Sequence, residues 1–240
     1  WTFNVVVTDS QVPVISSCPT NINVNTAAGQ CSATANWSVP TMFDNCAGAA
    51  LTSTHNPGDV FPIGTTTVTY TATDASGNTA TCTFTVTVTD TELPVISGCP
   101  ANINVTATGA SCDAVANWTA PTATDNCALQ SFTSTHNPGD VFPIGTTTVT
   151  YTAVDSVGNT STCSFTVTVT DTQVPVISGC PADINTTNDA TTCGAVVNWT
   201  APTATDNCSA GLTFTSSHNP GDVFPVGTTV VTYTATDASG

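Results

Sequence analysis

The chain has 240 residues with 16 acidic side chains, three histidines and neither lysine nor arginine, so its formal net charge is −16 at pH 7. This composition excludes nucleic acid and anionic membrane surfaces as partners, because both are bound through lysine and arginine. It also excludes Schiff-base catalysis, which needs a lysine amine. No stretch approaches the roughly 20 apolar residues of a membrane-spanning helix, so membrane insertion is not expected.

Residues 1–9, "WTFNVVVTD", are the first predicted strand. Phe3, Val5 and Val7 lie on one face of the alternation, as in a half-buried strand. Nearly the same sequence recurs as "CTFTVTVTD" at 82–90 and "CSFTVTVTD" at 163–171. The chain therefore begins with a segment that elsewhere ends a repeated unit.

Further strands and turns follow between this segment and its first recurrence. Segments 65–74 and 82–90 alternate threonine with apolar side chains and are predicted strands. Segment 56–59 has Pro and Gly at the centre of a turn, and Asp74 begins a second turn at 74–78. Because no segment of ten or more residues has helical spacing, the fold class is predicted to be all-β.

The chain is built from three copies of one module. "CP" begins at Cys18, Cys99 and Cys180, which are equally spaced, and a tryptophan and an Asp-Asn-Cys triplet follow at matching intervals. The modules are predicted at 10–90, 91–171 and 172–240. The third stops at "TATDASG" and lacks the strand that closes the other two.

A module of about 80 residues with six or seven such strands is predicted to be a β-sandwich. Tandem sandwiches of this kind, each contacting mainly its neighbours, are expected to stack as a rod. The tryptophans occur once per copy in mid-strand and are predicted core residues: Trp37, Trp118 and Trp199.

The segments "PVISGCP", "NWTAPTATDNC", "FPIGTTTVTYTA", "GNTSTC" and "FTVTVTD", in this order and spacing, resemble the hyalin repeat (HYR) domain family. The resemblance covers nearly the whole chain. It implies immunoglobulin-like extracellular modules with a role in extracellular layers and adhesion. It supplies no catalytic residues, so an enzyme is not predicted.

The cysteines recur at fixed spacings without a C-x-x-C pair, which indicates a disulfide framework and an extracellular or cell-surface location. The resemblance implies bonds Cys18–Cys82 and Cys99–Cys163, with Cys180 unpaired. The additional pairs would then be Cys31–Cys46, Cys112–Cys127 and Cys193–Cys208. Four cysteines allow three connectivities, so the spacing alone leaves the pairing open.

Calcium is the one cofactor that the sequence supports, through carboxylates predicted at strand ends: Asp44, Asp90, Asp125, Asp171 and Asp206. The alternative is that these are turn residues and solvated acids. His55, His136 and His218 lie beside turns and are interpreted as structural. Sequons at Asn36, Asn117 and Asn198 predict covalent glycans.

Two functions remain open. The chain is either a structural rod or filament, or an adhesive, binding or spacer segment of a larger surface protein. Residues 1–9 are either the end of a preceding module or a strand donated to the third module of another copy, which would make a head-to-tail homopolymer. Trp1 stands where the other copies have cysteine, which fits a donated strand held without a covalent bond and also fits a preceding domain of a different type.

Overall fold

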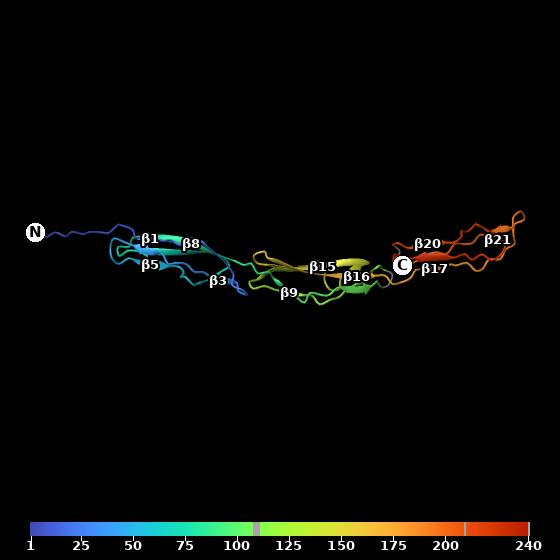
Figure 1. The fold of residues 1–240 in the computed structure, drawn as a ribbon, viewed down its shortest axis with the longest axis horizontal. Helices are drawn as coiled ribbons and strands as arrows, with labels where there is room; N and C mark the ends of the chain where they lie inside the picture. The colour runs from blue at the N-terminus through green and yellow to red at the C-terminus, as the bar shows by residue number, and fades with distance from the viewer. Residues whose placement is uncertain (108–110, 209, 240) are drawn as a thin grey trace. The chain divides into compact units, whose positions relative to one another are not determined.

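The computed structural model describes residues 1–107, 111–208 and 210–239, and every regular element in these ranges is a β-strand. Among them is no helix long and apolar enough to cross a membrane. The strands fall into three successive repeats, whose ribbons can be followed by colour in Figure 1. The prediction of an all-β fold made of tandem β-sandwiches is confirmed.

The first repeat has eight strands. They are β1 (Val14–Ser16), β2 (Ile22–Asn25), β3 (Ser32–Thr34), β4 (Thr41–Phe43), β5 (Ala50–Ser53), β6 (Val60–Pro62), β7 (Gly64–Thr73) and β8 (Thr79–Thr89). Four of them form a sheet in the order β2-β8-β7-β5. The pairs β1-β4 and β3-β6 lie opposite this sheet and complete the sandwich.

The last strand of the repeat lies inside the four-stranded sheet. β8 pairs with β7 in antiparallel and with β2 in parallel orientation, so that Ile22 lies opposite Val86 and Val24 opposite Val88. Phe84, Val86 and Val88 of β8 are 3%, 0% and 2% exposed, which makes β8 a principal source of core side chains. A repeat without this strand has an incomplete core.

The core lies between the two layers. Phe61 from β6 packs against the buried faces of β7 and β8, and Trp37 meets Phe84 edge-on with ring centroids 5.2 Å apart. The Trp37 indole Nε1–H donates a hydrogen bond of 2.8 Å to the hydroxyl of Tyr70. The alternation of threonine with apolar residues therefore places one face of each long strand in the core.

The second repeat has the same eight strands. They are β9 (Val95–Ser97), β10 (Ile103–Thr106), β11 (Asp113–Val115), β12 (Thr122–Thr124), β13 (Leu129–Ser134), β14 (Val141–Pro143), β15 (Gly145–Asp155) and β16 (Thr160–Thr170). Their sheet order, β10-β16-β15-β13 with the pairs β9-β12 and β11-β14, repeats that of the first.

The third repeat has six strands among its described residues. They are β17 (Val176–Ser178), β18 (Gly194–Val196), β19 (Thr203–Thr205), β20 (Thr213–Ser216), β21 (Val223–Pro225) and β22 (Tyr233–Thr236). They form three two-stranded pairs, β17-β19, β18-β21 and β20-β22. Within these described residues, nothing takes the place that β8 and β16 have in the other repeats.

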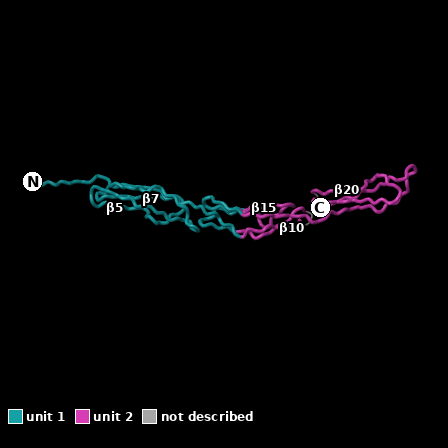
Figure 2. The backbone as a smooth tube through the Cα atoms, viewed as in Figure 1, with its two compact units in different colours: residues 1–97, 122–133, 152–162 teal, residues 98–121, 134–151, 163–240 magenta. Residues whose placement is uncertain are grey.

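The chain forms two compact units, which are coloured separately in Figure 2. The first contains residues 1–97, 122–133 and 152–162, and the second contains 98–121, 134–151 and 163–240. The junction between the first and second repeats therefore lies within the first unit. The junction between the second and third repeats lies within the second unit.

Candidate functional site

Each repeat junction contains a cluster of acidic side chains. At the first junction, Asp90 follows β8 and lies 2% exposed beside the loop after β12, where Asp125 and Cys127 stand. One ligand atom from each of these three residues lies within 4.8 Å of the other two. The cluster forms because the end of one repeat's last strand meets the Asp-Asn-Cys loop of the next.

The loop has a locally determined shape. Asp125 Oδ1 accepts the backbone N–H of Cys127 at 3.0 Å, which is the turn that aspartate makes with a residue two positions on. The same bond recurs from Cys46 to Asp44 at 3.0 Å and from Cys208 to Asp206 at 2.7 Å. In each case the turn uses one carboxylate oxygen and leaves the other free.

Several oxygen atoms at the first junction are buried without a hydrogen-bond partner. Asp90 Oδ1 accepts the N–H of Glu92 at 3.1 Å, but Asp90 Oδ2, Asp125 Oδ2 and Asn126 Oδ1 have no partner. Buried acceptors are rarely left unsatisfied, because removing them from water is unfavourable. The three unpaired oxygens are hard donors of the kind that Ca²⁺ prefers.

The charge of Asp90 also requires compensation. Burial by itself would raise the pKa of this carboxyl, but hydrogen bonds from four neighbours, the Cys127 thiol foremost, outweigh it and hold the pKa below its ordinary value. Asp90 is therefore ionised at neutral pH. Because the chain has neither lysine nor arginine, a bound cation is the natural counter-charge for these carboxylates.

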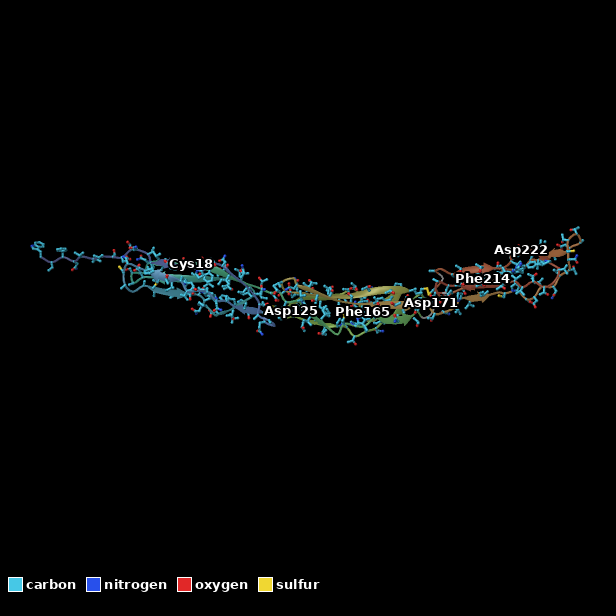
Figure 3. The ribbon with its side chains drawn as sticks, in the orientation of Figure 1. Cys18, Asp125, Phe165, Asp171, Phe214 and Asp222 are labelled. Atoms are coloured by element: carbon cyan, nitrogen blue, oxygen red, sulfur yellow. A yellow bond between two sulfur atoms is a disulfide. The ribbon has the colours of Figure 1, made fainter. Side chains whose placement is uncertain are left out.

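The second junction has the same arrangement. Asp171, Asp206 and Cys208 form the cluster, and Asp171 is 6% exposed. Asp171 Oδ2, Asp206 Oδ2 and Asn207 Oδ1 are again buried and unpaired. Asp125 and Asp171, one from each junction, are labelled in Figure 3.

A third cluster lies at the start of the first repeat, where Asp44 and Cys46 lie with Asp9. Asp9 was not among the carboxylates predicted from the sequence, although it stands one repeat period before Asp90. The asparagines Asn126 and Asn207 were missed as well, although each belongs to an Asp-Asn-Cys triplet. The repeat period could have found Asp9, and the Asp-Asn-Cys triplets could have found the two asparagines.

The cysteine pairing differs in part from the one that the family resemblance implies. Disulfides join Cys18 to Cys82 and Cys99 to Cys163, as the resemblance implies, and Cys180 is free and exposed. The third disulfide joins Cys112 to Cys208.

The predicted pairs Cys31–Cys46, Cys112–Cys127 and Cys193–Cys208 are absent from the structure, in which Cys31, Cys46, Cys127 and Cys193 are free. The reason is that the two cysteines of one repeat have different neighbours. Cys127 lies beside Asp90 at the junction with the first repeat, whereas the sulfur of Cys112 lies 3.4 Å from the Asn207 carbonyl oxygen at the junction with the third.

The third repeat contains a groove of about 890 Å³. Cys180, Ile184, Trp199, Phe224 and Tyr233 are among the residues that line it. These are the counterparts of residues that β8 covers or contacts in the first repeat. Ile184, for example, corresponds to Ile22 and is 49% exposed.

Residues 1–9 form no strand pairing in the structure. They leave the first repeat as an extended segment that ends at the N-terminus (Figure 1). The side chains of Phe3, Val5 and Val7 are 86%, 74% and 90% exposed. Their alternation is that of β8, but here nothing covers the apolar face.

The remaining residues singled out in the sequence are the three histidines and the sequon asparagines. His55 packs on Phe61 with ring centroids 5.2 Å apart, and its Nδ1 lies 3.2 Å from the Thr54 hydroxyl. His136 and His218 make the equivalent contacts with Phe142 and Phe224. The sequon asparagines are exposed, and their glycosylation stays a prediction: Asn36, Asn117 and Asn198.

The fold and the junctions define a class, that of tandem β-sandwich repeat proteins stabilised by disulfides. Within this class the HYR domain matches residues 8–88, 89–169 and 170–240. The chain belongs to the HYR domain family.

Similar proteins include hyalin from Strongylocentrotus purpuratus and from Lytechinus variegatus, each 41% identical across the whole chain. The chain spans 20% and 47% of these two proteins. A sushi, von Willebrand factor type A, EGF and pentraxin domain-containing protein of Rattus norvegicus is 42% identical over 62% of the chain, which spans 4% of it. These relatives are extracellular or cell-surface proteins.

Proposed function

We propose that the chain is an extracellular structural protein that assembles head to tail, with residues 1–9 of one copy completing the third repeat of the next. The groove of the third repeat is the observation that carries this proposal. It lies where the sheet of the first repeat has β8 between β2 and β7. It therefore has the position and the lining to receive one further strand.

The donated segment has the pattern that the groove requires. Phe3, Val5 and Val7 stand one repeat period before Phe84, Val86 and Val88, the side chains with which β8 fills the core of the first repeat. Burying side chains of this kind contributes about 1.5–3 kcal/mol each. A strand in the groove would also satisfy backbone groups along an open sheet edge.

The open core of the third repeat supports the same proposal. Val68 and Tyr70 of β7 are 0% and 3% exposed, whereas their counterparts Val231 and Tyr233 are only partly buried. The side chains are the same in both repeats, so the difference in their burial comes from the neighbouring strand β8, which has no counterpart among the described residues of the third repeat. A donated strand would restore the burial that β8 provides.

Trp1 makes this contact non-covalent. It occupies the position of Cys82, so a donated strand would leave Cys180 without a disulfide partner. Because the donating and receiving surfaces differ, the contact does not close on itself and extends into a filament.

We also propose that the junction clusters bind calcium. The buried and unpaired oxygens of two aspartates and one asparagine at each junction support this assignment. Calcium there would neutralise carboxylates in a chain that has neither lysine nor arginine, and it would join the end of one repeat to the loop of the next.

A second candidate function is that of a spacer or adhesive segment in a longer surface protein, with the groove filled by a strand that follows residue 240. The observation that favours it is that the chain spans only part of its hyalin relatives. Both functions place the chain outside the cell, and neither is catalytic.

Electron microscopy of the purified chain, with and without residues 1–9, tests the proposed assembly. We expect filaments from the full chain and single short particles from residues 10–240. An excess of a peptide of residues 1–9 should occupy the grooves and shorten the filaments. The matched control peptide carries Phe3→Asp and Val5→Asp and should leave them unchanged. Particles of equal length with and without residues 1–9 would exclude strand donation.

A further inference from the structure

Two free cysteines meet at the first repeat junction. Cys31 and Cys127 belong to consecutive repeats and are both free, and the Cys31 side chain lies near enough to Cys127 to raise the pKa of its thiol. The amide of Asn126 also donates a 3.0 Å hydrogen bond to the carbonyl oxygen of Gln30. The residues preceding the two cysteines are therefore held together, and the two thiols lie at one contact between repeats.

The second junction shows the same positions joined covalently. Cys112 and Cys208 are the counterparts of Cys31 and Cys127, each one repeat period later, and they form a disulfide across a sequence separation of 96. Their Cα atoms are 5.1 Å apart, a normal span for this bond. The amides of Asn126 and Asn207 contact Cys127 and Cys208 in the same way, at 3.4 Å.

We propose that Cys31 and Cys127 form a disulfide, so that successive repeats are covalently joined at both junctions of the chain. The bond links the second cysteine of one repeat to the third cysteine of the next. It differs from the bonds within repeats, Cys18–Cys82 and Cys99–Cys163, which tie the start of a repeat to its own last strand.

The chemistry requires a disulfide oxidant, such as oxidised glutathione. One cysteine thiolate attacks the glutathione disulfide, forms a mixed disulfide and releases one glutathione thiolate. The second cysteine thiolate then attacks the protein sulfur of the mixed disulfide and releases the other glutathione. Two cysteine thiols are thereby oxidised, one glutathione disulfide is reduced to two thiols, and the two thiol protons pass to solvent or to the released thiolates.

The bond also determines which atoms of the neighbouring acidic cluster can bind a metal ion. Cys127 lies within 4.8 Å of the ligand atoms of Asp90 and Asp125. Once its sulfur is in a disulfide, Cys127 neither offers a thiolate to a soft metal nor donates a hydrogen bond to Asp90. Asp90 Oδ1 still accepts the Glu92 N–H, the Asn126 amide and the Thr26 hydroxyl. The oxygens of the cluster remain as the only ligands, as they already do beside Cys208.

The pairing extends to Cys193 and Cys46, and this extension rests on the proposed head-to-tail assembly. If residues 1–9 complete the third repeat of another copy, the first repeat follows that third repeat as the second follows the first. Cys193 of one copy then lies opposite Cys46 of the next, in the relation of Cys31 to Cys127. The bond within the chain does not depend on this assembly, so the two can fail separately.

Peptide mapping under non-reducing conditions tests the proposal. The chain is equilibrated with oxidised and reduced glutathione until Cys18–Cys82 has formed, alkylated, and digested with a protease that cleaves before aspartate. We expect residues 9–43 to be linked to both 74–89 and 125–139. The pairing Cys31–Cys46 would instead link residues 9–43 to 44–58, and that result would overturn the proposal.

Alkylated Cys31 and Cys127 in protein whose Cys18–Cys82 bond is complete would overturn it equally, whether the thiols are free or bound to metal. The variant Cys31→Ser should release the peptide 125–139 as an alkylated monomer. Its matched control is Cys193→Ser, the same position in the third repeat, which should leave the linkage of 125–139 unchanged. A peptide linking 189–205 to 44–58, present only in assembled protein, would report the bond between copies.

Discussion

At the repeat junctions, buried aspartates hold negative charge that no lysine or arginine compensates. Asp90 is almost fully buried, its pKa is held below the ordinary value, and its Oδ2 has no hydrogen-bond partner. In most proteins arginine or lysine would compensate such a charge, but this chain has neither. The junction is therefore where a cation should change the stability of the chain most.

Calcium binding is the prediction at this scale. At 100 times its dissociation constant, calcium at a junction adds about 2.7 kcal/mol to the free energy of unfolding. We expect Asp90→Asn to reduce by one the number of calcium ions bound per chain, measured by isothermal titration calorimetry. Asp59→Asn is the control, because Asp59 is a turn acid that accepts a 2.8 Å hydrogen bond from Asn56. Unchanged binding by Asp90→Asn, or no calcium uptake by the parent chain, would contradict the assignment.

The sequence was a better guide to the acidic residues at the junctions than to the pairing of the cysteines beside them. Aspartates in the Asp-Asn-Cys loops and at the ends of the closing strands were recognisable as hard oxygen donors at strand ends. Cysteine pairing was not predictable in the same way, because the four cysteines in each of the first two repeats allow three connectivities within that repeat. The contact of Cys112 with the next repeat's loop is a tertiary contact that spacing within one repeat does not contain.

Hairpins close the long strands of the sheets. In the turn between β15 and β16, the Asp155 side chain is 0% exposed and accepts the backbone N–H groups of Val157, Gly158 and Asn159 at 2.7–2.9 Å. The Asn159 amide also donates a 3.0 Å hydrogen bond to the carbonyl oxygen of Glu92. The turn is therefore joined to the start of its own repeat.

This hairpin gives a prediction for acid stability. Burial would raise the pKa of Asp155, but hydrogen bonds from Asn159 and from backbone N–H groups outweigh it and lower the pKa below 3.8. The stabilisation is therefore present above pH 3.8 and is lost as the pH falls through the folded-state pKa. We expect Asp155→Ala to lower the free energy of unfolding by about 3 kcal/mol at pH 7, measured in denaturant.

The loss caused by Asp155→Ala should shrink as the pH falls from 7 to 2.5, because protonation of the Asp155 carboxyl removes these charge-assisted bonds from the parent chain as well. Asp140→Ala is the comparison, because Asp140 accepts one turn N–H, that of Asn137, at 2.7 Å. An equal effect of Asp155→Ala at pH 7 and pH 2.5 would show that the ionised carboxylate is not what stabilises the turn.

The long elements were predictable and the short ones were not. Alternation over 65–74 and 82–90 predicted strands that the structure has as β7 (Gly64–Thr73) and β8 (Thr79–Thr89). The three-residue strands β1, β3, β4 and β6 are too short for any period to be read. They are held by partners elsewhere in the repeat, as Val14 is by Phe43.

At the scale of the whole molecule, one segment and one groove remain unmatched. Residues 1–9 have the pattern of a closing strand and an uncovered apolar face. The third repeat has a groove at the place that β8 and β16 fill in the first and second repeats. The proposed strand donation between copies would account for both. It also sets a register, because Trp1 must lie where Cys82 lies relative to Cys18.

The register can be tested by introducing the missing cysteine. The variant Trp1→Cys is made together with Cys46→Ser, which removes the other proposed bond between copies. The control is Thr2→Cys in the same background, since neighbouring residues of a strand point to opposite faces. We expect Trp1→Cys to give a ladder of covalent oligomers on a non-reducing gel, with residues 1–8 of one copy linked to residues 171–182 of the next. Monomers only, or a ladder no stronger than that of Thr2→Cys, would contradict strand donation.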